Sequence, residues 1–572
     1  MESPYMFPTS AKEVKKLGWE WIDIIIFTGD AFVDHPSFGT ACIARYLQSF
    51  GYRVAVVPQP SWRDDLRDFR KLGAPRLFFG VNSGAMDSMV NHYTAAKRLR
   101  HDDAYTPEGR AGARPDRAVT VYTRILKQLY PDVPVVIGGV EASLRRLTHY
   151  DYWDDALKPS VLVDSGADWL CYGMGERTML TLSRAIERGW NRHQMESIPQ
   201  IAFLRSGAPR PKEGDLVLHS FEECQASKKA YAENFHLFET NANLLTPARL
   251  FEGVADGYVQ VNPPCPPATT EEMDSFWALP FTKLPHPRYE GKRIPAYDMI
   301  KDSIITHRGC FGGCNFCTIA AHQGKFIQSR SEGSIVSEAR SLAAMPSFHG
   351  NISDLGAPTA NMYGMGGQDR SKCAVCRRKS CLFPAPCANL DRSHERVLEL
   401  YRKVCAVKGI RHAYIGSGVR YDLFLSKDGF IDRTGKEYLR SLMLEHTSGR
   451  LKVAPEHTED DVLAYMAKPS FKLFERLRVE FDRINREEGT HTELVPYFIS
   501  SHPGCTLAHM QRLSERGSLR GIWMEQVQDF MPTPMTTSSA MFYTGLDPRT
   551  LKPVFVERDP ERKKTQKSKF FK

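Results

Sequence analysis

The sequence predicts an α/β fold in two large parts, a doubly wound parallel sheet followed by a second α/β region. Two observations predict it. Short apolar strands alternate with helical patterns along the first two hundred residues, and the same signals resume at "DSIITHRG" after a proline-rich interruption. At 572 residues the chain is also too long for one core, so two or three domains are expected.

Residues 1–225 are interpreted as a Rossmann-like domain, similar in pattern to cobalamin-binding domains. "IDIIIFTGD" predicts a buried strand, "FGTACIARYLQSFG" a helix that ends at glycine, and "YRVAVVPQ" the next strand. "RLFFGVN", "VPVVIGG" and "ADWLCYGMGE" continue the alternation. Glycines at strand ends suit a ligand at the carboxyl edge of the sheet, and they equally suit tight turns.

The pattern weakens over residues 226–294, where "VNPPCPPATTEEMD" is rich in proline, and we expect a linker or covering segment there. Residues 295–545 form the second α/β region. The basic tail, residues 546–572, lacks periodicity and is expected to be disordered.

The composition indicates a cytoplasmic protein. No apolar run approaches the roughly 20 residues that span a bilayer, and the N-terminus "MESPYMFPTSAKEVKK" does not resemble a signal peptide. In a reducing compartment, 13 unevenly clustered cysteines favour metal ligation or redox chemistry over disulfides. The net charge of +9 permits contact with a polyanion, but surplus Lys and Arg more often form a solvated surface.

Three cysteines, Cys310, Cys314 and Cys317, lie in "THRGCFGGCNFCTIAAHQGK" between an apolar run and a helical pattern. A closed structural zinc site takes four ligands, and iron–sulfur clusters are normally held by four cysteines. Three local thiolates on a cubane cluster would leave one iron for a distant ligand or for substrate. Zinc completed from elsewhere, or three buried thiols without a ligand, are the alternatives.

The Cys-x3-Cys-x2-Cys spacing, with Phe316 before the last cysteine, resembles the signature of radical S-adenosylmethionine enzymes. The context "HRGCFGGCNFC" after a long N-terminal domain is similar to the YgiQ-type subfamily, from "GDAFVDHPSFG" to "QVQDFMPTPMT". The resemblance implies that the three cysteines bind a 4Fe–4S cluster whose fourth iron is chelated by S-adenosylmethionine. It further implies reductive cleavage to a 5′-deoxyadenosyl radical, which abstracts hydrogen from a substrate.

The resemblance also implies that residues 295–545 form a partial (β/α)6 radical-SAM barrel. Plausible strands, after "DSIITHRG", are "GNISDLGAPTANMYG", "RHAYIGSGVRYD", "RLKVAPEHT", "TELVPYFISSHPG" and a sixth near "EQVQDFMPTP".

Four residues are implied as contacts of S-adenosylmethionine. The family's Gly-Gly-Glu segment corresponds here to Leu355-Gly356-Ala357-Pro358, which lacks the acid and leaves the methionine amine to backbone carbonyls. Ser417 and Arg420 are candidates to hold the methionine carboxylate, with an ordinary surface ion pair as the alternative for Arg420. Phe316 would lie beside the adenine.

"APEHTEDDVLAYMAKP" is similar to a segment of methylthiotransferase- and Elongator-like radical enzymes. Its Glu456 and His457 would point towards the site, either in a proton-transfer role or simply as capping and packing residues. No catalytic residue is identified.

A second group, Cys373, Cys376, Cys381 and Cys387, lies in an insertion over residues 370–390. Four thiols at these spacings are typical of a closed metal site, holding zinc or an auxiliary iron–sulfur cluster. Free or regulatory thiols are the alternative.

Cobalamin is not expected. Cobalamin domains often carry Asp-x-His-x-x-Gly, whereas the nearest stretch here, residues 34–39, has no residue between Asp34 and His35.

The sequence therefore predicts a radical S-adenosylmethionine enzyme of unknown substrate, served by a reducing electron donor such as flavodoxin or ferredoxin. The alternatives are an iron–sulfur electron-transfer or cluster-carrier protein and an RNA-binding module with a structural cluster. RNA is prompted only by the basic tail and the net charge. No membrane partner is expected.

Overall fold

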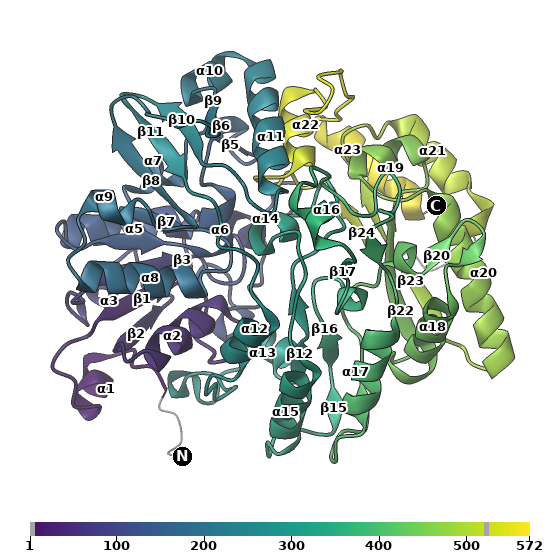
Figure 1. The fold of residues 1–572 in the computed structure, drawn as a ribbon, viewed down its shortest axis with the longest axis horizontal. Helices are drawn as coiled ribbons and strands as arrows, with labels where there is room; N and C mark the ends of the chain where they lie inside the picture. The colour runs from purple at the N-terminus through teal and green to yellow at the C-terminus, as the bar shows by residue number, and fades with distance from the viewer. Residues whose placement is uncertain (1–5, 520–525, 572) are drawn as a thin grey trace.

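The computed structural model describes residues 6–519 and 526–571. An N-terminal half, purple to blue in Figure 1, lies beside a green half, and the yellow C-terminal segment lies along the second half and reaches back to the first. No helix in the described ranges is long and apolar enough to cross a membrane.

A nine-stranded sheet organises the N-terminal half. Strands β2-β1-β3-β4-β7 run parallel, and β8-β11-β10-β9 extend the sheet with mainly antiparallel pairing. The expectation of a mixed α/β fold with a large, parallel-dominated sheet is confirmed. The bounds are β1 Ile24–Thr28, β2 Val54–Pro58, β3 Phe78–Asn82, β4 Val135–Ile137, β7 Trp169–Cys171, β8 Ile201–Ser206, β9 Leu216–Leu218, β10 Leu250–Val254 and β11 Gly257–Val261.

Helices cover both faces of this sheet because side chains alternate along each buried strand. In β1, Ile25 and Phe27 belong to the apolar core on the side of α5, whereas Ile24 and Ile26 belong to the core on the side of α2 and α8. A continuous apolar strand, "IIIFT", is therefore required here. The helices are α2 Gly39–Ser49, α5 Ala118–Leu129 and α8 Glu176–Glu187.

The stretch 226–294 differs from the expected linker. It contains helix α11 (Lys228–Ala242), strands β10 and β11, and helix α12 (Thr270–Trp277). The two strands form a hairpin around a turn at Ala255–Asp256 and pair inside the main sheet. Because their apolar side chains complete the sheet, this segment is part of the N-terminal core.

Parallel strand pairs follow one another in chain order through the second half. β12 pairs with β16, β15 with β19, a bridge joins Val419 to Val453, and β22, β23 and β24 are adjacent. The strands are β12 Ser303–Ile305, β15 Asn351–Ile352, β16 Asp354–Gly356, β19 His412–Ala413, β22 Arg450–Glu456, β23 Glu493–Ser500 and β24 Gln526–Asp529. Glu525, which opens the sixth expected strand, lies outside the described residues.

Helices pack on the outer side of these strands (Figure 1), around the largest apolar core of the molecule. They are α15 Glu332–Ala343, α17 Glu395–Cys405, α18 Arg433–Glu445, α19 Asp460–Met466, α20 Phe471–Glu488 and α21 Leu507–Glu515.

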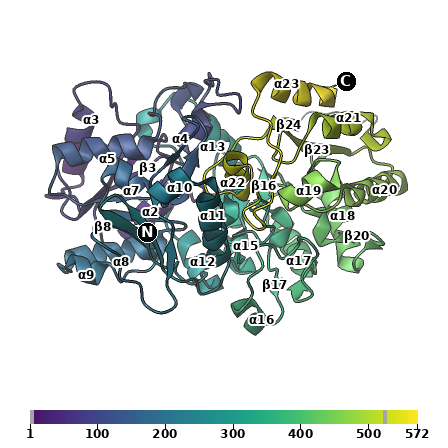
Figure 2. The same cartoon turned by 90° about the horizontal axis from the view of Figure 1, so that it is seen from above.

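The C-terminal segment is ordered, which corrects the expectation of a disordered tail. Helix α22 (Thr537–Thr544) packs against α11 of the N-terminal half, and α23 (Pro560–Ser568) packs against α21 (Figure 2). The Gln566 side chain is fully buried, and the Phe570 ring lies tilted against that of Phe498, with centroids 5.3 Å apart. The buried side chains of Gln566 and Phe570 thus fix the end of this segment, although most of the side chains around them are charged.

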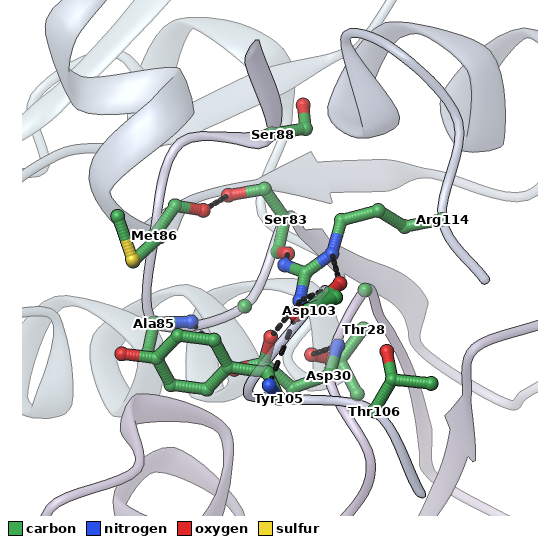
Figure 3. A network of polar contacts seen from close by, with 12 residues as sticks. Thr28, Asp30, Ser83, Ala85, Met86, Ser88, Asp103, Tyr105, Thr106 and Arg114 are labelled. Carbon is green, nitrogen blue, oxygen red and sulfur yellow. Dashed lines mark hydrogen bonds and ion pairs between the residues drawn. The ribbon is translucent and has the colours of Figure 1, made fainter. Parts of the chain in front are cut away.

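A buried charge network fixes the loop over the carboxyl ends of β1 and β3 (Figure 3). The Arg114 guanidinium pairs with Asp30 at 2.9 Å and with Asp103 at 3.1 Å, and donates to the Ser83 carbonyl at 2.7 Å. One cation thus serves two carboxylates. Burial, reinforced by the nearby Asp103 charge, raises the pKa of Asp30 to about 6.

The raised pKa of Asp30 predicts that the stability of the protein depends on pH. Since its pKa is raised in the folded state, Asp30 contributes less stability as pH rises from about 4 to 6. The Asp30→Asn variant has no carboxyl group to ionise at this position, so its stability does not fall in this way. The unfolding free energy of the variant minus that of the wild type should therefore increase by on the order of 2 kcal/mol between pH 4.5 and 7.5. Urea denaturation at both pH values measures it, and a pH-independent difference would contradict it.

Candidate metal centre

The three clustered cysteines lie on one loop, here called the cysteine loop, residues 309–327. Strands β13 (His307–Arg308) and β14 (Gln328–Ser329) pair antiparallel at its base, and helix α14 (Ile319–Gln323) lies within it. The backbone therefore leaves β13, turns through the cysteines and returns to the neighbouring strand.

Two glycines allow this loop to pack closely against other segments. A Cβ on Gly312 would lie 2.5 Å from Nη1 of Arg420. Gly313 has a φ of +64°, and a Cβ there would lie 2.8 Å from Cβ of Ser380. "GCFGGC" therefore encodes the close approach of Arg420 on one side and of the second cysteine group on the other.

The three thiols are close enough to influence one another. Burial raises the pKa of Cys317 to about 12, with further contributions from Cys314 and Cys310. Burial also raises the pKa of Cys310, whose Sγ lies 3.4 Å from Oγ1 of Thr359. In the described ranges no three His, Cys, Asp or Glu side chains are arranged around a single ion. A cluster differs, because each thiolate binds a different iron.

Arg420 lies beside these thiols. Its Nη1 donates to Sγ of Cys314 at 3.3 Å, while Nε and Nη2 donate to Asp422 at 3.0 and 2.5 Å. The two side chains are only 10% and 9% exposed, so Arg420 is not a surface ion-pair residue. Its charge also favours thiolate at Cys310, opposing the effect of burial.

Gly356 and Ser417 line a cavity of about 400 Å³ between the sheet edge of the N-terminal half and the ends of β12 and β16. The Ser417 hydroxyl donates to Asp354, which also accepts from the Gly416 amide at 2.9 Å. The Gly356 carbonyl accepts from the Thr306 amide at 2.8 Å. Sequence analysis missed Asp354, which directly precedes the Leu-Gly-Ala-Pro segment.

Phe316 does not line that cavity. It borders a separate space of about 1430 Å³, where β23, β24, α23 and the loop after α4 (Ser88–His92) meet. Its ring meets that of His502 edge-on, with centroids 6.2 Å apart. The structure thus brings Arg420 to the cysteines and separates Phe316 from Gly356 and Ser417.

Glu456 lies near the clustered cysteines, whereas His457 lies beside Cys505. Glu456 is buried, pairs with Lys468 at 3.6 Å and is close enough to influence the pKa of Cys317. His457 places Nε2 3.5 Å from Sγ of Cys505. Burial lowers its pKa to about 3, so it is neutral near pH 7. His457 therefore packs against the base of α21, which agrees with the packing alternative and not with a proton-transfer role.

The second cysteine group packs against the cysteine loop. The Cys381 amide donates to the Phe311 carbonyl at 3.0 Å, and the Ser380 hydroxyl donates to the Gly312 carbonyl at 2.7 Å. Burial is the main cause that raises the pKa of Cys381 to about 11, and the charges of the other three cysteines add to it. The nearby charge of Lys325 opposes this rise. The four thiols are thus neighbours without being arranged around a single ion.

The N-terminal half holds the cysteine loop from its other side. Arg308 forms a buried pair with Glu176 at 2.6 Å, and Nδ1 of His322 lies 3.1 Å from the Ser143 hydroxyl. His35 does not take part. Its Nδ1 accepts from the Ser37 amide at 3.1 Å, and Asp34 pairs with Arg45. The expectation against cobalamin stays a prediction.

Comparison with known proteins identifies the class. Residues 6–303 match the family model described as "Radical SAM N-terminal", and residues 525–571 match DUF3362, a domain of unknown function. UPF0313 proteins of Bacteroides thetaiotaomicron and Geobacter sulfurreducens are 53% and 47% identical over 99% and 98% of this chain, and 93% and 91% of their own. The Escherichia coli K12 UPF0313 protein YgiQ is 41% identical, over 96% of this chain and 80% of its own.

The chain therefore belongs to the UPF0313 (YgiQ-type) family of the radical S-adenosylmethionine superfamily. A solved structure, the radical S-adenosylmethionine methyltransferase TsrM from Kitasatospora setae with cobalamin and a [4Fe-4S] cluster bound, covers 90% of this chain and 73% of its own. At 14% identity and a TM-score of 0.49, it carries no inference about this chain.

Arg420 gives a testable prediction. Arg420→Met leaves Asp422 buried without its cation, so the unfolding free energy should fall by about 3–5 kcal/mol. In the double variant Arg420→Met/Asp422→Leu much of this loss should be recovered. The exposed pair Arg433–Glu437 is the control, and Arg433→Met should cost less than about 1 kcal/mol. Chemical denaturation of the full chain measures the unfolding free energy of all three variants. If Arg420→Met costs as little as Arg433→Met, the Arg420–Asp422 pair does not contribute as predicted.

Proposed function

We propose that the protein is a radical S-adenosylmethionine enzyme with Cys310, Cys314 and Cys317 as its cluster ligands. The observation that carries the proposal is the gathering of three thiols on one glycine-rich loop, with the Arg420 guanidinium 3.3 Å from Cys314. Three thiols are one fewer than a closed site needs. We further infer that the strands from β12 to β24 form the partial (β/α)6 barrel of this superfamily.

The donor set suits a 4Fe–4S cluster. Sulfur ligands are the usual ligands of such clusters, and the loop offers three of them in mostly buried surroundings. Bound there, a cluster would supply the electron that cleaves S-adenosylmethionine to methionine and a 5′-deoxyadenosyl radical. The thiols must lose their protons on loading, so assembly is favoured by higher pH.

The chain's own residues supply position and charge. Arg420, fixed by Asp422, donates to the Cys314 sulfur, and its charge favours thiolate at Cys310. Gly356 and Ser417 line the 400 Å³ cavity, and we retain them with Arg420 as proposed contacts of S-adenosylmethionine. Phe316 borders the separate 1430 Å³ space and stays a proposed contact only if the ligand extends past the cysteine loop. Because the Ser417 hydroxyl already donates to Asp354, Ser417 can accept a hydrogen bond from the ligand but not donate one without releasing Asp354.

The electron donor is proposed to be a small reducing protein such as flavodoxin or ferredoxin, in the cytoplasm. All thirteen cysteines are free in the structure, which agrees with a reducing compartment. The substrate is not assigned by any of these features.

The proposal predicts substrate-independent cleavage. The anaerobically reconstituted and reduced enzyme should release methionine and 5′-deoxyadenosine from S-adenosylmethionine, slowly alone and faster with the true substrate. Cys310→Ala, Cys314→Ala and Cys317→Ala should each abolish the release, which chromatography with mass spectrometry measures. Cys224→Ala, at a buried thiol of the N-terminal half away from the 400 Å³ cavity, is the control and should retain it. Intact cluster redox without 5′-deoxyadenosine would instead indicate an electron carrier.

A triple variant, with Cys310, Cys314 and Cys317 all changed to alanine, tests the second cysteine group. We propose that Cys373, Cys376, Cys381 and Cys387 hold an auxiliary iron–sulfur cluster or zinc. These thiols are close enough to influence one another, as a shared metal site requires. Metal analysis of the folded triple variant should therefore still find zinc or iron in roughly stoichiometric amount. The metal found identifies the kind of site, and metal-free folded protein would exclude a metal site.

A further inference from the structure

Arg146 is a buried cation in the N-terminal half. It has no role in the proposed chemistry. It follows helix α6 (Gly139–Leu144) at the carboxyl end of β4 and is 4% exposed. Its guanidinium lies against two aromatic rings, 4.7 Å from the centroid of Tyr172 and 4.9 Å from that of Phe238. The rings support a cation there but do not neutralise it.

Arg146 has no anionic partner in the described part of the chain. Nη1 donates to the Ser143 carbonyl, and Nε is buried with no acceptor. Burial lowers its pKa to about 10, so it stays charged near pH 7. An uncompensated buried charge costs several kcal/mol, which other arginines in this region avoid. Arg308 pairs with Glu176, and Arg177 pairs with Glu272.

Arg146 lines a cavity of about 150 Å³ enclosed by the N-terminal half and helix α14 of the cysteine loop. Lys325, a second buried cation, also lines it, and its Nζ donates only to the Arg378 carbonyl among the described residues. Gly173 and His322 border both this cavity and the 400 Å³ cavity beside it. A ligand can therefore place an anionic group near Arg146 and its body in the larger space.

We propose that this cavity binds a phosphate group, held by the guanidinium of Arg146. A buried guanidinium without a carboxylate matches an anionic ligand, the Lys325 ammonium lines the same cavity, and a guanidinium fork suits phosphate oxygens. The cavity lies at the carboxyl edge of a doubly wound sheet, where such folds bind their ligands. The phosphate has three possible sources: free phosphate, a nucleotide, or the phosphodiester of a larger cofactor. Cobalamin, which the spacing of Asp34 and His35 argues against, represents the third source in the test.

Calorimetry on the full, anaerobically reconstituted chain tests this with inorganic phosphate, adenosine monophosphate and hydroxocobalamin as separate probes. At least one should bind saturably, and which one binds identifies the source. Arg146→Met should weaken that binding at least about tenfold, since it removes a charge-assisted hydrogen bond. Arg146→Lys keeps the charge and should weaken it less.

Two comparisons separate a binding role from a structural one. Arg177→Met, which lines the same cavity but removes an arginine already paired with Glu272, should change the affinity less than about twofold. Without ligand, Arg146→Met should melt no lower than the wild type, because methionine keeps contact with both rings and removes a buried charge. Failure of all three probes to bind, or equal binding by Arg146→Met, would overturn the proposal. Neither result depends on S-adenosylmethionine cleavage.

Discussion

The cysteine loop lies where separate parts of the chain meet, and its hydrogen bonds hold them together. The Asn315 amide donates to the Met466 carbonyl at 3.0 Å, and the Asn315 carbonyl accepts from Ser538 of the C-terminal segment at 2.9 Å. The second cysteine group bonds to Phe311 and Gly312, and the N-terminal half contacts His322. A loop whose hydrogen bonds reach several parts of the chain can keep half-buried thiols in fixed positions.

Among the described residues, buried charge around this loop is balanced in pairs, except at Arg146 and Lys325. Arg420 with Asp422, Arg308 with Glu176 and Lys468 with Glu456 each join a cation to a buried carboxylate. Such pairing offsets the desolvation that burial imposes. It also places Arg420 next to sulfur, where a positive charge favours thiolate. Arg146 lacks such a carboxylate, so the account assigns its missing anion to a ligand.

Sequence patterns predicted the features that depend on local residues. The apolar strands of the N-terminal sheet and the cysteine spacing were both visible, because period and spacing are local. The hairpin of β10 and β11 was missed because a proline-rich stretch follows it, although "VADGY" carries a turn signal. Helix α23 was missed because its face is charged, although Asp559 and Pro560 form a recognisable helix start. The burial of Arg420 and the partner of Asp354 depend on residues distant in sequence, which no local pattern encodes.

The central claim is that three cysteines leave one cluster iron open and that S-adenosylmethionine occupies it. Electron paramagnetic resonance of the reduced, reconstituted chain, with and without S-adenosylmethionine, tests this most directly. The account predicts that the cluster signal changes on addition and that a carboxylate labelled with oxygen-17 broadens it through coupling to the iron. An unchanged spectrum, in protein shown by equilibrium dialysis to bind S-adenosylmethionine, would contradict the claim.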